Sequence, residues 1–220
     1  TAVHRPAGPG GVASGKPVQS LTGHKEMIEA AEFSGDATHI VSAGWDATVR
    51  VWDISKVESI AELKGHKRGI STGSQSNDGK RVASANSREF KLWDGEKKEQ
   101  LADLGGENNG AKQVAMSPDG AWLVSINRDG VANLWDVEKK SQKTTLDRTP
   151  KAAETASTES TDENPSAPPP SDAPELEAIQ GLAYSRDGKW LAIAREDGHI
   201  SMRTAVDGKV HRDLEAFADV

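Results

Sequence analysis

Residues 39–53 read HIVSAGWDATVRVWD, and this stretch decides the fold. Apolar side chains alternate with polar ones in two short runs, 39–43 and 48–52, and turn residues separate the runs. Alternation with period 2 predicts β-strands, because successive side chains of a strand point to opposite faces. The stretch therefore predicts two antiparallel strands, the second of which ends at Trp52-Asp53.

The Trp-Asp pair returns twice at nearly constant spacing. Trp93 and Trp135 are also followed by Asp, after intervals of 41 and 42 residues. Two further motifs recur in order, a Gly-His pair ahead of the first two Trp-Asp pairs and a Ser-x-Asp turn between the motifs. They stand at Gly23-His24, Gly65-His66, Ser34–Asp36, Ser76–Asp78 and Ser117–Asp119. A period of about 40 residues indicates a repeat protein.

With these motifs in this order, the chain resembles the WD-repeat β-propeller family. The resemblance covers residues 16–145 with most motifs and residues 175–215 with fewer. It implies an all-β fold built from β-propeller blades of four antiparallel strands. In the first unit we expect the strands at 28–34, 39–43, 48–52 and 59–63. One such unit cannot bury both of its faces, so the blades are expected to stack around an axis.

The turn serines set the number of blades. Ser34, Ser76, Ser117 and Ser185 follow one another at intervals of 42, 41 and 68 residues, so the last interval holds 26 residues beyond one repeat. Six of the ten prolines lie within residues 150–174, among many Ser, Thr and acidic residues, a composition that favours disorder. We therefore expect a flexible Gly/Pro linker at 1–15, a propeller strand with blades 1–3 at 16–148, a disordered insertion at 149–174, and a degenerate blade 4 at 175–220.

Both ends of the repeat region predict an outer strand. Residues 16–21 read as the outer strand of a blade whose other strands are absent, and residues 209–214 read as the outer strand of the fourth blade. Since both strands compete for one place, the sequence predicts four blades plus one extra N-terminal strand. The resemblance implies that they are part of a seven- or eight-bladed ring, because propellers of the WD-repeat family mostly have that many blades. The blade faces at the break would then be open to self-association. We expect them to be lined by core residues such as Val41, Val49, Val82, Leu92, Val124, Leu134, Ile179 and Leu191.

The resemblance also implies a buried hydrogen-bond network of Asp, His, Ser and Trp in each blade. The first blade matches it with His24, Ser42, Asp46 and Trp52. The other matching residues are His66, Ser84 and Trp93 in the second blade, and Ser125, Asp129 and Trp135 in the third. The second blade is one residue short before Glu89, which removes the Asp, and the fourth keeps only Asp197. We therefore expect stability to decline toward the C-terminus.

Composition excludes several classes of function. The formal net charge of −7 argues against nonspecific binding to nucleic acid or to an anionic membrane, since both need a basic surface. No apolar run approaches the length of a membrane span, so we expect a soluble domain. With no cysteine, disulfides and cysteine-based zinc or redox sites are excluded, and neither a cytoplasmic nor a periplasmic location is favoured.

Three patterns imitate catalytic or ligand sites. His24, Ser42 and Asp46 have the residue types of a nucleophilic triad, but the serine would lie within a strand without an oxyanion site. Residues 10–16 approach a phosphate-binding loop, but Pro17 stands where the loop needs Ser or Thr. The six histidines show no spacing typical of metal ligands. We expect no catalytic residue, no metal and no cofactor.

One tryptophan lies outside the repeat motif. Trp45 precedes Asp46 in the turn between the second and third strands, and the resemblance places it on one face with several basic residues. The candidate partner-binding set is Trp45, Lys25, Met27, Lys67, Arg68, Arg88 and Arg128. Aromatic residues and arginines are frequent anchors of protein interfaces. Two interpretations stay open at this point: a partner covers Trp45, or Trp45 packs only on the loop of the adjacent blade.

Two hypotheses of function follow. The first is a non-catalytic scaffold that binds a protein or peptide through the loop face of its WD-repeat blades. The second is a regulatory or recruiting domain of a larger multidomain enzyme. A fold by itself does not choose between them.

Overall fold

The computed structural model describes residues 2–3, 19–105, 109–147 and 179–215. These residues form four sheets of four antiparallel strands and one two-stranded pairing, with no helix among them. The expected linker at 1–15, apart from Ala2 and Val3, and the expected insertion at 149–174 lie outside the described residues.

The first two sheets each follow the chain order of their strands. Blade 1 consists of β3 (Ile28–Phe33), β4 (His39–Gly44), β5 (Thr48–Asp53) and β6 (Glu58–Lys64). Blade 2 consists of β7 (Thr72–Gln75), β8 (Arg81–Ala85), β9 (Phe90–Asp94) and β10 (Glu99–Asp103). The strands of blade 1 agree with those expected from alternation to within one residue at each end.

Blades 3 and 4 repeat this order. Blade 3 consists of β11 (Gln113–Met116), β12 (Trp122–Ile126), β13 (Ala132–Asp136) and β14 (Ser141–Asp147). Blade 4 consists of β15 (Ile179–Tyr184), β16 (Trp190–Arg195), β17 (His199–Thr204) and β18 (Val210–Glu215). The fourth blade therefore has all four strands although its sequence keeps few motif residues.

The same turn joins the first two strands of every blade. The turn serine donates its hydroxyl to the aspartate two residues later, at 2.6 or 2.7 Å, and accepts the amide five residues later at 2.8 to 3.0 Å. In blades 2 to 4 the next residue after the aspartate is glycine, with φ near +70° as at Gly79. Glycine adopts this left-handed conformation without a steric penalty. The turn thus fixes the hairpin register from four residues of local sequence.

Three apolar cores hold the four blades together, one between each pair of neighbours. Val41, Val49 and Val82 lie in the first core, and Leu92 lies in the second with Met116. The third core joins Val124, Leu134, Ile179 and Leu191. All eight residues that we expected to line the open faces are therefore buried, each with 6% exposure or less. That expectation was wrong because the side chains point into the stack instead of out at its ends.

The N-terminal strand does not complete a blade. β2 (Gln19–Ser20), from the segment expected to form an outer blade strand, pairs antiparallel with β1 (Ala2–Val3). Residues 2 and 3, which we expected in a linker, thus form a strand. The fourth blade takes its own outer strand, β18, from residues 210–215.

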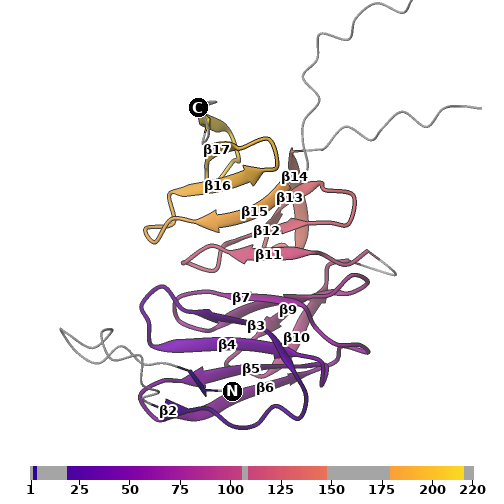
Figure 1. The fold of residues 1–220 in the computed structure, drawn as a ribbon, viewed down its shortest axis with the longest axis vertical. Coiled ribbons are helices and arrows are strands. Elements are labelled where there is room, and N and C mark those ends of the chain that lie inside the picture. Colours follow the sequence, from indigo (N-terminus) through magenta and orange to yellow (C-terminus); the bar gives the residue numbers. More distant parts are fainter. Residues whose placement is uncertain (1, 4–18, 106–108, 148–178, 216–220) are drawn as a thin grey trace, which may run out of the picture.

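Figure 1 shows the blades in chain order along the long axis, with blade 1 in indigo at one end and blade 4 in orange and yellow at the other. The first strands of the blades, β3, β7, β11 and β15, are neighbours in this order and form the inner wall of the stack.

Candidate functional site

In blade 1 a chain of hydrogen bonds connects three parts of the sheet. Trp52 Nε1 donates to Ser42 Oγ at 2.8 Å, and Ser42 Oγ lies 2.7 Å from His24 Nε2. His24 Nδ1 lies 2.9 Å from an Asp46 carboxylate oxygen. Since a carboxylate only accepts, Nδ1 donates to Asp46, and in the neutral tautomer that this leaves, Nε2 accepts from the serine hydroxyl. The chain ties β5 to β4, and β4 to the loop before β3.

Asp46 is the acceptor at the end of this chain. Partial burial opposes ionisation of Asp46, but bonds from the Lys25 amide, Thr48 and His24 outweigh it and lower its pKa to about 2. The carboxylate therefore stays charged at neutral pH and holds the loop and the β4–β5 turn together.

The distances among His24, Ser42 and Asp46 match those of a catalytic triad, but the surroundings do not. Ser42 is 4% exposed, and the Trp52 indole occupies one side of its oxygen. A nucleophile needs access to a substrate and donors for the developing oxyanion. The three residues thus form a structural link between loop and sheet.

Blade 2 keeps the tryptophan, serine and histidine of the chain and has a different acid beside the histidine. Trp93 Nε1 donates to Ser84 Oγ at 2.8 Å, and Ser84 lies 2.7 Å from His66 Nε2. Glu89 takes the place of the missing aspartate: its carboxylate accepts the Lys67 amide at 3.1 Å and lies 3.4 Å from His66 Nδ1. The longer glutamate side chain thus spans the gap left by the shorter turn. The sequence had predicted that this blade lacks the acid.

The pKa values of His66 and Glu89, the two ionisable partners in blade 2, are both lowered. Burial lowers the pKa of His66, although the nearby Glu89 opposes this effect. Burial alone would raise the pKa of Glu89, but bonds from Asn86 and Lys67 and the charge of His66 lower it. His66 is therefore neutral beside a charged glutamate at neutral pH.

The network shortens in the last two blades. In blade 3, Trp135 Nε1 donates to Ser125 Oγ at 2.9 Å, and Asp129 lies in the exposed β12–β13 turn. Glu107, which replaces the histidine, lies outside the described residues. In blade 4, Arg203 takes the tryptophan position and donates to Gly208 O at 3.2 Å. Among the described residues, no indole-to-serine bond links the strands of blade 4.

The candidate partner-binding residues gather on the loops at one end of the blades, and we call this set the Trp45 surface: Trp45, Lys25, Met27, Lys67, Arg68, Arg88 and Arg128. Backbone bonds hold these loops together. The Trp45 amide donates to Met27 O at 2.8 Å, and the Ile70 amide donates to Gly44 O at 3.0 Å. The second bond crosses from blade 2 to blade 1. Loops of neighbouring blades therefore have fixed positions on this surface.

Trp45 itself is partly packed and largely open. Its Nε1 donates to Glu29 at 2.7 Å, and a Cβ placed on Gly69 would lie 3.1 Å from the Trp45 Cα. Trp45 nevertheless has 56% of its surface exposed, and Met27 has 55%. The Trp45 ring thus rests against the loop of the next blade and still faces solvent, and whether a partner covers it stays a prediction.

The basic residues of this surface are all exposed. Within the described part of the chain, no ion pair involves Lys25, Lys67 or Arg68, nor Arg88 or Arg128. The loop face of blades 1 to 3 thus carries five basic side chains without an ion-pair partner in the described residues, together with the exposed acids Glu26 and Glu29, on a chain whose net charge is −7.

The described ranges hold no group of three His, Cys, Asp or Glu residues that fits a metal ion. They also contain no helix of the length and apolarity that crossing a bilayer requires.

Comparison with known proteins identifies the family. The WD domain, G-beta repeat, matches residues 15–53, 57–94 and 98–136, together more than half of the sequence. The chain belongs to the WD-repeat family. The anaphase-promoting complex subunit 4 WD40 domain matches residues 170–220, which include blade 4. The second and third matched ranges start at β6 and β10, the outer strands of blades 1 and 2, so the sequence repeats of this WD-repeat chain are offset from the sheets by one strand.

Similar proteins match over short stretches. A serine-threonine kinase receptor-associated protein of Gallus gallus is 30% identical over 70 residues, which is 31% of this chain and 20% of that protein. The ribosome biogenesis protein WDR12 homolog of Aedes aegypti is 29% identical over 76 residues, 34% of this chain and 18% of that protein. The small ribosomal subunit protein RACK1 of Caenorhabditis elegans is 40% identical over 42 residues, 19% of this chain and 13% of that protein. Each similarity spans a fifth or less of the relative's length.

Sequence reasoning missed two parts of the site. Glu29 fixes the Trp45 ring, and Gly69 makes room for it, yet both come from strand and loop positions without a motif. Their pairing depends on how far the blade 2 loop reaches over blade 1, and no local pattern encodes that distance.

Proposed function

We propose that this WD-repeat chain is a non-catalytic protein-interaction scaffold that binds a protein or peptide through the Trp45 surface. The observation that carries the proposal is the exposure of Trp45 and Met27 among basic side chains that have no ion-pair partner in the described residues. An exposed aromatic ring on fixed loops is a typical interface anchor, because little side-chain entropy is lost when a partner covers it.

The charge of this surface indicates the kind of partner. Five exposed lysine and arginine side chains lie on the loops of blades 1 to 3 at the same end as Trp45 and Met27. Acidic residues on a partner would pair with them and speed association, an effect that salt weakens. We therefore propose an acidic protein segment with at least one apolar side chain as the partner.

The relatives support a role in protein association. The relative from Gallus gallus is named for association with a serine-threonine kinase receptor, and the RACK1 relative is named as a small ribosomal subunit protein. The absence of catalysis is supported by the arrangement of His24, Ser42 and Asp46, whose hydroxyl and carboxylate are used within the blade.

The test starts from a partner captured on the wild-type chain and then purified. Its dissociation constant is measured against Trp45→Ala and against Val206→Ala, which truncates a side chain of similar exposure, 57%, on blade 4. We expect Trp45→Ala to weaken binding by about tenfold or more, and Val206→Ala to leave it within about twofold. Equal affinities for the two variants would contradict the proposal.

Self-association through an open blade face is a separate proposal about partners. In β16, Leu191 and Ile193 point toward blade 3, so Ala192 and the paired Met202 of β17 point the other way. Leu214 of β18, with 39% exposure, adds to this face. We propose that a blade of another molecule covers it. Light scattering of the purified chain at micromolar concentration tests this, and a monomer would contradict it.

A further inference from the structure

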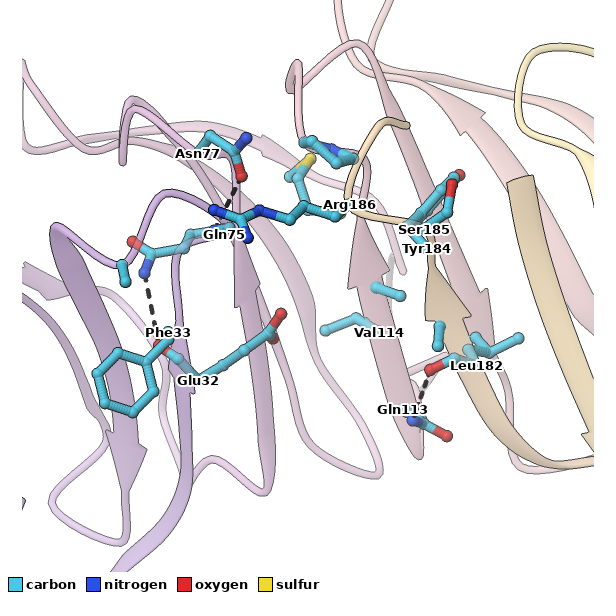
Figure 2. A pocket seen from close by; sticks show the side chains of 16 residues that line it. Glu32, Phe33, Gln75, Asn77, Gln113, Val114, Leu182, Tyr184, Ser185 and Arg186 are labelled. Atoms are coloured by element: carbon cyan, nitrogen blue, oxygen red, sulfur yellow. Dashed lines mark hydrogen bonds between the residues drawn. The ribbon is translucent and has the colours of Figure 1, made fainter. Parts of the chain in front are cut away.

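A cavity of about 580 Å³ lies along the inner wall of the stack. Figure 2 shows its lining, to which all four blades contribute, including Glu32 of β3, Gln75 of β7, Val114 of β11 and Leu182 of β15. Arg186, in the β15–β16 turn, also lines it. Pockets of this volume take ligands the size of a few amino-acid residues. We call it the inner cavity.

Bonds between blades hold the wall of the inner cavity in place. The Gln75 side-chain amide contacts the backbone of β3. Ser74 Oγ accepts the Met116 amide at 3.0 Å, and Gln113 Nε2 donates to Leu182 O at 3.5 Å. Each pair of neighbouring inner strands is thus bridged by a side chain, so the cavity is formed before any ligand arrives.

Glu32 is the acidic residue of this lining. Its carboxylate points into the space between β3 and β15, toward Val114 and Leu182 (Figure 2). The Ser74 hydroxyl bonds to it, and no ion pair with a Lys, Arg or His of the described residues involves it. Burial among the surrounding atoms raises the pKa of Glu32 although its side chain is open to the cavity. Glu32 is exposed to solvent along the cavity, so a ligand can reach its carboxylate, which has no paired cation among the described residues.

The charge is specific to blade 1. Counting back from the turn serines, the positions equivalent to Glu32 hold Ser74, Ala115 and Ala183. None of these three is charged. The repeat therefore has no general need for a carboxylate at this position.

We propose that the inner cavity binds the side-chain ammonium group of a lysine in an extended segment of a partner protein, with Glu32 as its counter-ion. A lysine places a primary ammonium at the end of an aliphatic stem. The stem fits against Val114 and Leu182 while the ammonium reaches the carboxylate. Because binding supplies the missing cation, it relieves the cost of keeping Glu32 charged.

Two other residues at the rim of the inner cavity suit the peptide that would carry the lysine. Arg186 is exposed and donates only, so it suits a backbone carbonyl or a carboxylate that flanks the lysine. Phe33, with 44% exposure, offers an apolar contact on the blade 1 side. The cavity opens near the β3–β4 and β15–β16 turns, at the opposite end of the strands from the Trp45 surface. It is therefore a second site, independent of the proposed function.

The test uses backbone-amide NMR of the isotopically labelled chain with a peptide as probe. The probe is acetyl-Ala-Ala-Lys-Ala-Ala-amide, and its matched control carries norleucine in place of lysine. We expect the lysine peptide to shift the amides of residues such as Gln113 and Leu182, and the norleucine peptide to leave them unchanged. Glu32→Gln should raise the dissociation constant of the lysine peptide about tenfold.

Glu58→Gln is the control for net charge, since Glu58 is an exposed acid at the start of the outer strand β6. This variant should bind the lysine peptide as the wild type does. Equal binding of the lysine and norleucine peptides, or unchanged binding by Glu32→Gln, overturns the proposal. n-Butylamine carries one ammonium on the same four-carbon stem without a backbone, so binding of n-butylamine as tight as that of the lysine peptide would overturn the assignment to a protein segment.

Discussion

Blades 1 and 4 have the same four strands but differ in what holds them. In blade 1, Ser42 receives the Trp52 indole bond and contacts His24, which in turn contacts Asp46. In blade 4, Ile193 takes the serine position and Arg203 takes the tryptophan position. Blade 1 therefore has a buried chain of polar side chains from loop to sheet, whereas blade 4 lacks the tryptophan and the serine of that chain.

What the two blades share therefore suffices to form the sheet. Both keep the turn bonds, at Ser34 and Asp36 in blade 1 and at Ser185 and Asp187 in blade 4. Both also bury a core strand, with Ile193 fully buried in blade 4. The hairpin turn and the interblade core set the shape of a blade, while the polar chain fixes the loop that precedes it.

The sharpest test of this comparison replaces the acid in each blade. Asp46→Ala leaves the Lys25 amide and His24 without their acceptor, and we expect it to lower the free energy of unfolding by about 1 to 3 kcal/mol. Asp197→Ala removes the acceptor of the His199 amide in a turn of blade 4, where no indole-to-serine chain depends on it, and should cost only about 0.5 kcal/mol. Urea unfolding of the two variants measures both values. Similar losses would show that the polar chain does not distinguish the blades.

A second variant asks whether blade 2 behaves like blade 1. Glu89→Ala removes the acceptor of the Lys67 amide and the partner of His66, so we expect a loss of about 1 to 2 kcal/mol. Glu96→Ala, at a position with 71% side-chain exposure in the same blade, is the control and should cost little. If both variants unfold at the same urea concentration, Glu89 does not replace the aspartate energetically.

The pH dependence isolates the charge of Asp46. Its pKa of about 2 in the folded chain lies below the ordinary value, so its stabilisation is present above about pH 4 and is lost as the pH falls toward 2. Asp46→Asn lacks this charge. We therefore expect the stability gap between wild type and Asp46→Asn to narrow from pH 4 to pH 2, as thermal melts would show. A constant gap would mean that the charge contributes nothing.

The smallest expected effect has the opposite sign. Burial raises the pKa of Glu32, so its charge disfavours the folded state at neutral pH, whereas blade 4 has Ala183 at the same position. Glu32→Gln should therefore raise the melting temperature slightly at pH 7, and this gain should vanish below about pH 4, where the acid is protonated. A lower melting temperature of the variant at pH 7 would contradict this expectation.

The sequence predicted the blades well because their determinants are local. Alternation placed β4 and β5 within one residue of their ends, and the turn serines located β15 and β16 across the long interval. Those signals lie within a few residues of the structure that they specify. Strand bounds and turn bonds therefore follow from short stretches of the chain.

Features that depend on distance in space were not predicted. Glu89 reaches the aspartate position because its longer side chain offsets a shorter turn. The number of residues in the sequence shows the shorter turn but not the reach of the side chain. The eight residues expected at the open faces are buried because alternation gives two faces without saying which one meets a neighbour. The inner cavity likewise arises from four strands that are far apart in the sequence.

The inner cavity also couples the binding of a ligand to the angle between neighbouring blades. Its lining comes from four separate sheets, so widening the arc at any of the three interblade cores moves Glu32 away from Leu182. A ligand that contacts both Glu32 and Leu182 therefore resists bending of the whole stack, and its affinity depends on the angles between the blades. Each blade contributes one strand and its turn to the cavity wall, but the width of the cavity depends on all four blades together.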